Sequence, residues 1–356
     1  MADHETTKAQ NRERSDRERA TEPRMCNARP VHLTVGNTHK CNLDCPMCFK
    51  HYEAGHNMSY PTMPLEMFQG IADDAFGTAD RVTLTVSGDA LVSETIDQEL
   101  AIGGEFGVQY EITTNGLMLG RKTLIPLLLE HCRVLTISFD GATADTYEAI
   151  RLGGKFDKAT MAVRAFADAK REAGHGPQLA AMTVLQKDNV EELPDWVRLM
   201  ADLGVEALGV DHIVVPDFDT TPSCIHDRAG CNARMAEAAA VAEELGVPLR
   251  LPPPYEFEVE ASAGEEVERP TGRVRCPYVW SETWIGYDGT VSPCCNVAYT
   301  DKMGSVAEQP FSEIWNGSAY TDLRRSLAEG DPPQVCRDCH LAIREVETGE
   351  TYVKRT

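Results

Sequence analysis

Strand-like and helix-like segments alternate six times between residues 30 and 250 of this 356-residue chain. Gly174 and Gly204 stand where two of the intervening helices should end, since glycine readily adopts the left-handed backbone of a helix C-terminus. The pattern predicts a parallel sheet with helices outside it, either a partial barrel or an open doubly wound sheet. Both folds bind ligands at the carboxyl ends of their strands. The strand candidates are residues 31–35, 81–86, 108–114, 134–139, 179–185 and 207–215.

The rest of the chain divides by composition. The N-terminal residues are almost entirely polar and carry both charge signs, which predicts a disordered tail. After the repeats comes a Pro- and Glu-rich linker, and then a second unit in which Asp288-Gly289 predicts a hairpin turn. The expected segments are a tail (1–29), a core (30–245), a linker (246–275), the second unit (276–345) and a C-terminal tail (346–356).

Charge and hydropathy exclude some classes of partner. The net charge is −22, from 34 basic and 56 acidic residues, whereas nucleic acid or an anionic membrane surface needs a basic footprint. Such acidity suits a cationic or neutral small substrate, or serves solubility alone. No apolar run is long enough to span a bilayer, and the N-terminus has no signal segment, so we expect a cytoplasmic protein.

The chain has twelve cysteines, many of them clustered at 41–48, 294–295 and 336–339. Without an export signal, clustered thiols indicate metal or catalytic sites rather than disulfides. The first cluster, "CNLDCPMC", places Cys41, Cys45 and Cys48 on a loop directly after the first strand. Three thiolates can hold three irons of a [4Fe–4S] cube and leave the fourth iron open. The alternative is a zinc site completed by His39 or His51.

The stretch "CNLDCPMCF", in a six-fold βα chain, resembles the radical S-adenosylmethionine (SAM) enzymes. The resemblance implies a partial (β/α)6 TIM-like barrel whose open iron is chelated by the amino and carboxylate groups of SAM. It also implies that one electron, from a flavodoxin- or ferredoxin-type donor, cleaves SAM to a 5′-deoxyadenosyl radical. That radical removes a hydrogen atom from a substrate carbon, while the protein supplies orientation and excludes water.

Further stretches at strand ends match SAM-contacting segments of this family. "SGDAL" stands where the family carries a Gly-Gly-Glu-like turn for the SAM amino group, with Asp89 in place of the usual Glu. "TTNG" ends the third strand, and "ISFDGATADTYEAIR" ends the fourth. An arginine suits the SAM carboxylate because its planar fork binds carboxylates bidentately. The residues implied to contact SAM are Ser87, Gly88, Asp89, Asn115, Ser138 and Arg151.

The C-terminal cysteines resemble the SPASM/Twitch extension of radical SAM enzymes, on the phrases "IGYDGTVSPCC", "IWNGSAYTDLRR" and "VCRDCH". The resemblance implies one auxiliary [4Fe–4S] cluster, and a shortened, Twitch-like module, because no cysteine follows Cys339. Four protein ligands leave no open iron, which favours electron transfer. A four-cysteine zinc site is the alternative. The implied ligands are Cys276, Cys294, Cys336 and Cys339, with Cys295 as a substitute for Cys294.

The resemblance fixes the chemistry but leaves the substrate open. Our first hypothesis is an epimerase acting on a saccharide or aminocyclitol in natural-product (antibiotic) biosynthesis. It needs a hydrogen-atom donor opposite the radical, and the loop after the sixth strand carries two candidate thiols, Cys224 and Cys231. These thiols favour the epimerase narrowly.

Two other activities remain open. A dehydrogenase would pass one electron from the substrate radical to the auxiliary cluster, with Asp211, His212 or Lys187 relaying a proton. A peptide-modifying maturase is the third hypothesis. It is disfavoured because such enzymes often carry an N-terminal peptide-binding domain, and residues 1–29 are too short and polar for one. A non-catalytic iron–sulfur or zinc scaffold would leave the SAM-like stretches without a role.

Overall fold

A computed structural model gives the fold of the chain. One range in the linker region, residues 256–272, is the longest that lies outside the description. The described residues are 2–48, 51, 61–84, 87–213, 221–255, 273–276, 278–295, 302–339, 343–345 and 351–353.

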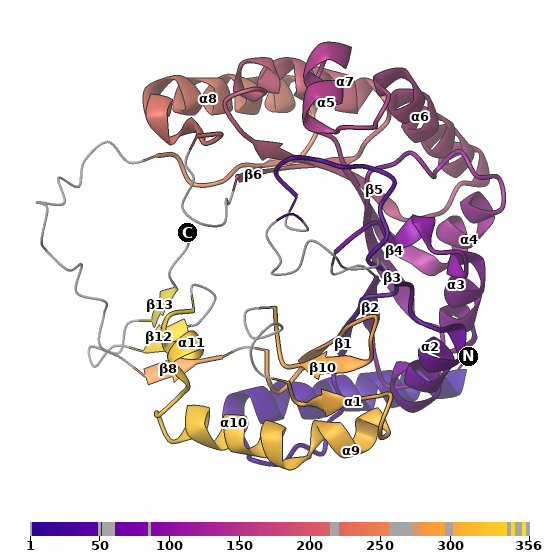
Figure 1. The fold of residues 1–356 in the computed structure, drawn as a ribbon, viewed down its shortest axis with the longest axis vertical. Helices are drawn as coiled ribbons and strands as arrows, with labels where there is room; N and C mark the ends of the chain where they lie inside the picture. The colour runs from indigo at the N-terminus through magenta and orange to yellow at the C-terminus, as the bar shows by residue number, and fades with distance from the viewer. Residues whose placement is uncertain are drawn as a thin grey trace, which may run out of the picture.

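Six parallel strands, each followed by helical structure, form the larger part of the molecule, as predicted (Figure 1). The strands are β1 (His32–Val35), β2 (Arg81–Leu84), β3 (Gln109–Thr114), β4 (Cys132–Ser138), β5 (Gln178–Leu185) and β6 (Ala207–His212). The helices are α2 (Leu65–Ile71), continued by the π-helical turn η2 (Ala72–Phe76), α3 (Ile96–Glu105), α4 (Leu124–His131), α5 (Ala144–Ile150), α6 (Phe156–Ala173), α7 (Leu193–Asp202) and α8 (Arg228–Leu245). The 3₁₀ turns are η3 (Ala90–Val92), η4 (Val190–Glu192) and η6 (Cys224–Asp227).

The sheet is the curved, partial barrel rather than the open doubly wound sheet. Its strand order is β11-β10-β9-β1-β2-β3-β4-β5-β6-β7, and it curves round with α2 to α8 on its outer side (Figure 1). Neighbouring strands from β1 to β6 pair in parallel and in chain order. Their carboxyl ends therefore meet along one edge, where ligands bind in such folds.

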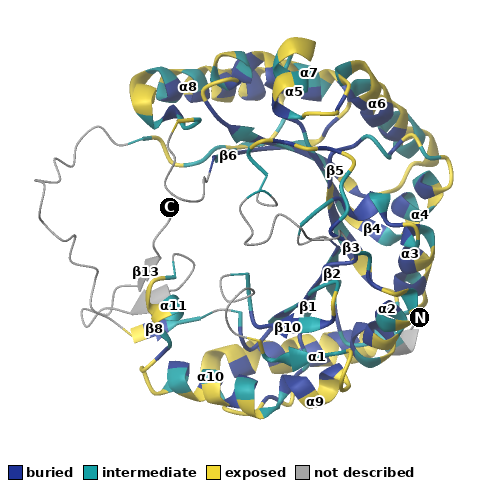
Figure 2. Cartoon of the chain, viewed as in Figure 1, coloured by how far each residue is buried: buried dark blue, intermediate teal, exposed yellow. Residues whose placement is uncertain are grey.

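Burial follows the alternation that the sequence shows. Along β5, from Gln178 to Leu185, every second side chain is buried. Helices α2 to α8 turn their buried sides toward the sheet and their exposed sides to solvent (Figure 2). At the C-terminus of α6, Gly174 has φ 73°, as the sequence predicts, and Gly204 after α7 has φ 86°.

The second unit does not stand apart from the barrel. Its hairpin strands, β9 (Glu282–Ile285) and β10 (Thr290–Ser292), turn at Asp288-Gly289 as predicted, and Gly289 has φ 82°. Strand β9 pairs in parallel with β1, so the hairpin extends the barrel sheet. The remaining elements of the unit are β8 (Arg273–Arg275), β11 (Gly304–Ser305), α9 (Phe311–Trp315), α10 (Ser318–Ala328), α11 (Gln334–Arg337) and β12 (Ile343–Glu345).

Two boundary predictions are wrong. The linker prediction fails at both ends, because β7 (Leu249–Arg250) pairs with β6 and belongs to the barrel sheet, and β8, at residues 273–275, pairs with β12 of the second unit. The predicted C-terminal tail contains β13 (Thr351–Val353), which pairs with β12 in a small antiparallel sheet together with β8. Both errors have one cause: a two- or three-residue strand is fixed by its distant partner and leaves no local pattern.

The N-terminal tail prediction is also wrong. Residues Ala2–Thr21 form helix α1, and the polar residues Lys8, Asn11, Ser15 and Glu18 on it are buried. Hydrogen bonds replace apolar packing here: Asn11 bonds the backbone of Arg29 in both directions, at 3.0 and 2.8 Å. A helix whose buried face is polar lacks the apolar periodicity on which sequence prediction depends. No helix in the described part of the chain is both long and apolar enough to cross a membrane.

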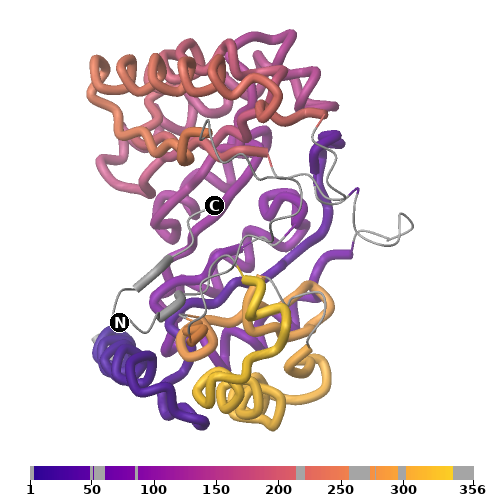
Figure 3. The backbone as a smooth tube through the Cα atoms, turned by 90° about the vertical axis from the view of Figure 1, so that its left-hand side faces the viewer, coloured from indigo at the N-terminus to yellow at the C-terminus, as the bar shows by residue number. Residues whose placement is uncertain are grey.

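Helix α1 joins the barrel to the C-terminal unit (Figure 3). Lys8 Nζ donates to the carbonyl of Gly107 (2.7 Å), before β3. Beyond the other end of α1, the Glu22 carboxylate accepts from Arg275 (2.7 Å) and Arg273 on β8. The connection between two parts of the chain that are far apart in sequence is thus made largely by polar contacts.

Candidate active site

The first group of cysteines lies on the loop after β1, at the carboxyl edge of the sheet. Two backbone hydrogen bonds hold this loop: the amide of Asp44 donates to the carbonyl of Leu152, and the amide of Cys48 donates to that of Cys45, each at 2.9 Å. Burial raises the pKa of the Cys45 thiol to about 11, and the neighbouring thiols of Cys41 and Cys48 add to the rise. The three thiols therefore share one electrostatic environment.

Asn115, at the end of β3, contacts the first of these thiols. Its Nδ2 donates to Asn42 Oδ1 (2.7 Å) and lies 3.8 Å from Cys41 Sγ, while its Oδ1 accepts from the amide of Leu117 (3.0 Å). The side chain is 4% exposed. The predicted contact residue therefore lies at the cysteine loop, with both ends of its amide engaged.

Asp89, at the end of β2, is held by its own chain. Its carboxylate accepts from the amides of Leu91 (3.0 Å) and Asn115 (2.8 Å) and from the hydroxyl of Thr114 (2.9 Å). Its own amide donates to the carbonyl of Lys40, next to Cys41, at 2.8 Å. Burial raises the pKa of this carboxyl, and the three hydrogen bonds oppose the rise.

Gly88 lets the β2 end approach the cysteine loop. It has φ 87°, and a Cβ at this position would lie 2.6 Å from the carbonyl oxygen of Lys40 and 2.8 Å from the carbonyl carbon of His39. Only glycine fits such a contact between two backbones. The Ser87-Gly88-Asp89 segment therefore supports the loop directly.

Arg151, after α5, lies at the second thiol. Its Nε donates to Asp140 Oδ2 (2.6 Å), and its Nη1 lies 4.0 Å from Cys45 Sγ. Asp140 is fully buried and also accepts from the hydroxyl of Thr183 (3.0 Å) and the amide of Val184 (2.7 Å). Part of the guanidinium fork is thus held by Asp140, and the rest is directed toward the cysteine loop.

The same edge holds buried polar atoms without a hydrogen-bond partner in the described structure. They include Ser87 Oγ at the β2 end, Gln186 Nε2 at the β5 end and Tyr147 OH, which lies close to Arg151 and Cys45. Buried polar groups are normally paired, so these atoms fit a polar ligand such as SAM. Ser138, the last residue of β4, lies half-buried on this edge as well.

The second group of cysteines gathers between β8, β10 and α11. Burial raises the pKa of Cys276 to about 12, and Cys294 and Cys336 are close enough to add to the rise. Burial raises the pKa of Tyr278, and Glu282 and the nearby Cys295 and Cys339 add to the rise. The amide of Cys339 donates to the carbonyl of Cys336. The cysteines of this group thus lie on or just after three separate elements and near one another, and their role as cluster ligands stays a prediction.

The two histidines proposed for the zinc alternative each have a neighbour outside the cysteine group. His39 stacks on Tyr287 of the β9–β10 turn, with ring centroids 4.2 Å apart, and His51 Nε2 lies 3.3 Å from Asp44 Oδ1. Within the described ranges, no three His, Cys, Asp or Glu side chains converge on a point for one metal ion. A [4Fe–4S] cube requires a different arrangement, because each thiolate binds its own iron.

The candidate proton-relay residues have other partners. Asp211 pairs with Arg250 at 2.8 Å, and His212 Nε2 lies 3.1 Å from the carbonyl of Pro253. His212 also stacks on Tyr255, with centroids 4.3 Å apart, while Lys187 is exposed. Their predicted catalytic role stays a prediction.

The candidate hydrogen-atom donors are buried. Cys224 is 4% exposed and Cys231 1%, and their thiols are hydrogen-bonded to each other. Cys224 lies on η6 and Cys231 on α8, after the carboxyl end of β6. Their donor role also stays a prediction, and it would require the pair to reach the substrate from this buried position.

Sequence reasoning missed two contributors to the edge. Asp140 holds Arg151, and its signal was a charged residue directly after an apolar strand, in "ISFDG". Tyr287 packs on His39 of the cysteine loop from the C-terminal unit, which no local pattern reveals.

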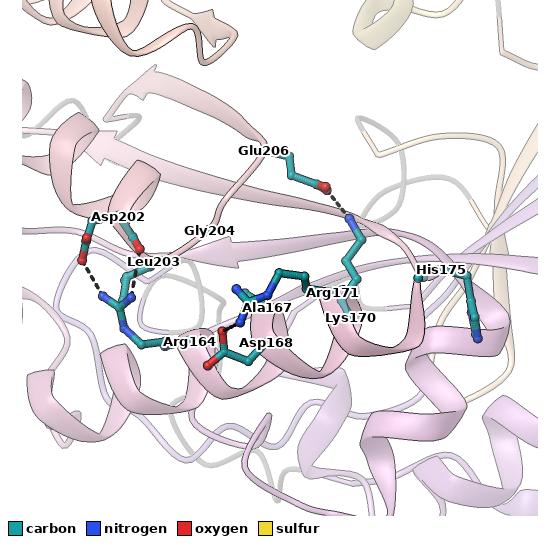
Figure 4. Close-up of a pocket in the computed structure, with 12 residues that line it drawn as sticks. Arg164, Ala167, Asp168, Lys170, Arg171, His175, Asp202, Leu203, Gly204 and Glu206 are labelled. Carbon is teal, nitrogen blue, oxygen red and sulfur yellow. Dashed lines mark hydrogen bonds and ion pairs between the residues drawn. The ribbon is translucent and has the colours of Figure 1, made fainter.

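A surface hollow of about 580 Å³ lies away from this edge, between the ends of α6 and α7 (Figure 4). Helix C-termini of a βα repeat lead into the amino ends of the next strands, which is the side opposite the ligand-binding edge. Arg164 pairs with Asp202, Lys170 with Glu206, and Arg171 with Asp168. These paired charges give the hollow a structural explanation. Arg164 connects α6 to the end of α7, and Lys170 connects α6 to Glu206 before β6.

Comparison with known proteins identifies both cysteine regions. Residues 38–200 match the radical SAM superfamily, and residues 276–340 match SPASM, an iron–sulfur cluster-binding domain. A tungsten-containing aldehyde ferredoxin oxidoreductase cofactor-modifying protein from Pyrococcus furiosus is 25% identical over 338 residues, which cover 87% of each chain.

The names of two other relatives refer to a bacteriocin and to a peptide. The subtilosin biosynthesis protein AlbA of Bacillus subtilis is 22% identical, over 87% of this chain and 64% of its own length. A PqqA peptide cyclase from Xanthomonas oryzae is 22% identical, over 90% of this chain and 82% of its own.

Among solved structures, SuiB of Streptococcus suis, bound to S-adenosylmethionine, has the same fold. It matches with a TM-score of 0.63 and 16% identity, over 88% of this chain and 71% of SuiB. The two family matches together span almost two thirds of the chain, and each contains one of the cysteine groups. The chain belongs to the radical SAM superfamily and carries a C-terminal SPASM domain, and these two domains imply SAM and two [4Fe–4S] clusters as its cofactors.

Proposed function

We propose that this enzyme modifies a peptide by removing a hydrogen atom from one of its carbons. The observation that carries the proposal is the likeness, over most of this chain, to a subtilosin biosynthesis protein and a PqqA peptide cyclase. These names favour the peptide hypothesis over the saccharide or aminocyclitol substrate that the sequence suggested. The net charge of −22 favours a peptide with positive charges.

The residues at the carboxyl edge support the first step. Bound SAM and its cluster would supply the radical that takes the hydrogen atom. Cys41, Cys45 and Cys48 would hold that cluster, with Asn115 beside Cys41 and Arg151 beside Cys45. These two side chains come from different elements, so together they fix the loop from two directions.

The C-terminal unit supports a second electron step. Cys276, Cys294, Cys336 and Cys339 would hold the auxiliary cluster, with Cys295 as the alternative to Cys294. A closed set of four ligands suits transfer of the electron left after hydrogen removal. This arrangement supports an oxidative peptide modification more directly than an epimerisation, in which the auxiliary cluster need not accept an electron.

The buried thiols bear on the epimerase hypothesis. A donor thiol must reach the substrate radical, whereas the free thiols of Cys224 and Cys231 are almost inaccessible and hydrogen-bonded to each other. The peptide proposal needs no such donor. Turnover in deuterium oxide separates the two: epimerisation with a thiol donor leaves one solvent deuteron on the attacked carbon, and oxidation leaves none.

The test uses the anaerobically reconstituted enzyme with SAM and a chemical reductant. Short peptides encoded beside its gene are supplied in one arm, and saccharides or aminocyclitols in another. We expect a peptide to stimulate release of 5′-deoxyadenosine, and we expect mass spectrometry to show that the peptide has lost hydrogen. Stimulation by a saccharide and by no peptide would refute the proposal. The matched controls are the triple variant C41A/C45A/C48A, which should be inactive, and Cys132→Ala, a core thiol distant in sequence from both groups.

A further inference from the structure

The carboxylate of Asp89 occupies the place where the family resemblance puts a direct contact to the SAM amino group. Three donors of this chain already engage it: the amides of Leu91 and Asn115 and the hydroxyl of Thr114. An ionised carboxylate offers about four lone-pair sites, so at most one site remains free. The residue is 2% exposed, so that remaining site is not open to solvent.

The three bonds connect Asp89 to the β3 end and, through it, to a cluster ligand. The Asp89 carboxylate fixes the amide of Asn115, and the Asn115 side chain lies against Cys41 Sγ (3.8 Å) and Asn42 Oδ1 (2.7 Å). A displacement of the Asp89 carboxylate would therefore move Asn115 and, with it, the Nδ2 atom that lies 3.8 Å from Cys41 Sγ.

A second connection runs through the backbone. The amide of Asp89 donates to the carbonyl of Lys40 (2.8 Å), one residue before Cys41. Gly88 packs so closely on His39 and Lys40 that a Cβ would lie 2.6 Å from the Lys40 oxygen. The segment thus touches the cysteine loop at the residues that lead into its first ligand.

We propose that Asp89 is a positioning residue for the SAM cluster: it sets the place of Cys41 through Asn115 and Lys40 instead of binding SAM itself. The shorter aspartate suits this task, because its carboxylate stays within reach of the backbone amide of Leu91, two residues on. This inference concerns the cluster loop and holds whichever substrate the enzyme takes.

The proposal separates cluster effects from SAM effects. If Asp89 positions the cluster, its loss alters the cluster before any SAM is added. If it binds SAM, its loss changes only SAM affinity. The readouts are therefore the EPR spectrum of the reduced, SAM-free enzyme, the rate at which a ferrous chelator removes iron from the cluster that responds to SAM, and the SAM affinity from EPR titration.

The first variants are Asp89→Asn and Thr114→Val. Asp89→Asn places an NH₂ group among N–H and O–H donors, and Thr114→Val removes one donor while keeping the side chain's shape. Since loss of an outer partner typically weakens metal binding 10- to 100-fold, we expect chelation about tenfold faster in each variant. The EPR signal without SAM should change as well. Thr114→Ser keeps the hydroxyl and should behave as the unmodified enzyme.

The double variant D89N/T114V tests whether the two residues act together. Groups in one hydrogen-bond network are not additive, so the double variant should lose iron no faster than D89N alone. If D89N does not fold, the comparison of Thr114→Val with Thr114→Ser decides the matter by itself. An unchanged SAM-free spectrum and chelation rate in the variants, with or without weaker SAM binding, would overturn the proposal.

Discussion

Asp140 shows how a single buried carboxylate orders the carboxyl edge. It joins the ends of β4 and β5 by accepting from Thr183 and Val184, and it holds Arg151 at the cysteine loop. The pair is buried, with side-chain exposures of 13% for Arg151 and 0% for Asp140. Breaking a buried ion pair by removing one charge is costly, because the other charge remains unpaired in a low-dielectric site.

We therefore expect Asp140→Asn to lower the free energy of unfolding by roughly 3 kcal/mol and to weaken SAM binding. Denaturant unfolding and SAM titration measure the two effects. The exposed pair formed by Glu148 and Lys155 is the control, since exposed pairs contribute little, and Glu148→Gln should leave both values unchanged. Equal behaviour of the two variants would contradict this account of Asp140.

Arg324 is a second buried charge, in the C-terminal unit. It is fully buried, stacks on Trp315 with its guanidinium carbon 4.2 Å from the ring centroid, and donates to the carbonyls of Val279 (3.0 Å) and Trp315 (2.9 Å). Burial lowers the pKa of this guanidinium, although the group remains charged. The residue ties α10 to the segment before β9.

Arg324→Met should cost about 3 kcal/mol of unfolding free energy, because it leaves two buried carbonyls unpaired and removes the stacked cation. Its neighbour Arg325 provides a matched control. That side chain is 49% exposed and pairs only with Asp322 in the contacts described, so Arg325→Ala should have little effect. Urea unfolding compares the two, and a larger loss in the Arg325 variant would argue against this role.

At the scale of single elements, α5 begins with a cap supplied from another part of the chain. The carboxylate of Glu192, on η4, accepts from the amides of Ala142 (2.7 Å) and Thr143 (3.1 Å) and from the hydroxyls of Thr143 (2.8 Å) and Thr146 (2.5 Å). Burial raises the pKa of Glu192, but these hydrogen bonds outweigh it and the net pKa is lowered. The cap fixes the helix that leads to Arg151.

The lowered pKa gives a pH dependence. A carboxyl with a depressed folded pKa stabilises the protein above its unfolded pKa, about 4.3, and loses that contribution as pH falls through the lower folded value. Glu192→Gln should therefore cost at most about 1 kcal/mol at neutral pH, since water screens this site. The difference from the unmodified enzyme should shrink as the pH falls below about 4.3 and disappear below the lower folded pKa. A constant difference across an acid titration of unfolding would contradict this.

Helix α1 also acts as an element, through its polar buried face. Asn11 makes three hydrogen bonds to the backbone at Arg29 and Thr78. Asn11→Ala should lower stability by about 2 kcal/mol, because buried backbone groups lose their partners. Glu13→Ala, on the exposed side of the same helix, is the control and should leave the thermal midpoint unchanged. Equal midpoints for both variants would mean that the Asn11 hydrogen bonds do not hold α1 to the segments at Arg29 and Thr78.

The whole molecule is best tested by its metal content. Two [4Fe–4S] clusters correspond to about eight irons per chain, and the triple variant C41A/C45A/C48A should retain about four. Those four should still give an EPR signal that no longer responds to SAM. Zinc in place of iron, or loss of all iron in the triple variant, would refute the assignment of two independent clusters.

Much of this architecture follows from local sequence. The parts that local sequence does not predict have one physical cause in common. The barrel strands are found from the sequence because alternating apolar residues and helix-ending glycines are local signals. The β1–β9 pairing, the small C-terminal sheet and the support of the cysteine loop by Tyr287 depend on contacts between distant segments. Helix α1 was missed because hydrogen bonds, which leave no hydropathy pattern, hold its buried face.

At the site, the sequence predicts which residues gather but not what each side chain faces. Asn115 and Arg151 lie at the cysteine loop. Part of the Arg151 guanidinium, however, is bonded to Asp140, and the Asp89 carboxylate accepts from residues at neighbouring strand ends. Three-dimensional packing decides which partner a side chain takes, and a sequence motif does not show this packing.

The parallel pairing of β1 with β9 has a consequence for electron transfer between the two clusters. Cys41 follows the carboxyl end of β1, whereas β10 runs antiparallel to β9 and returns toward the amino ends of β1 and β9 before it reaches Cys294. The two cysteine groups therefore follow opposite ends of one hydrogen-bonded part of the sheet. The rate of electron tunnelling falls exponentially with the distance between two clusters. Paired strands keep that distance constant, whereas a flexible linker would let it vary. The fold itself would therefore set the distance over which an electron passes between the two clusters, through the register of His32 on Glu282.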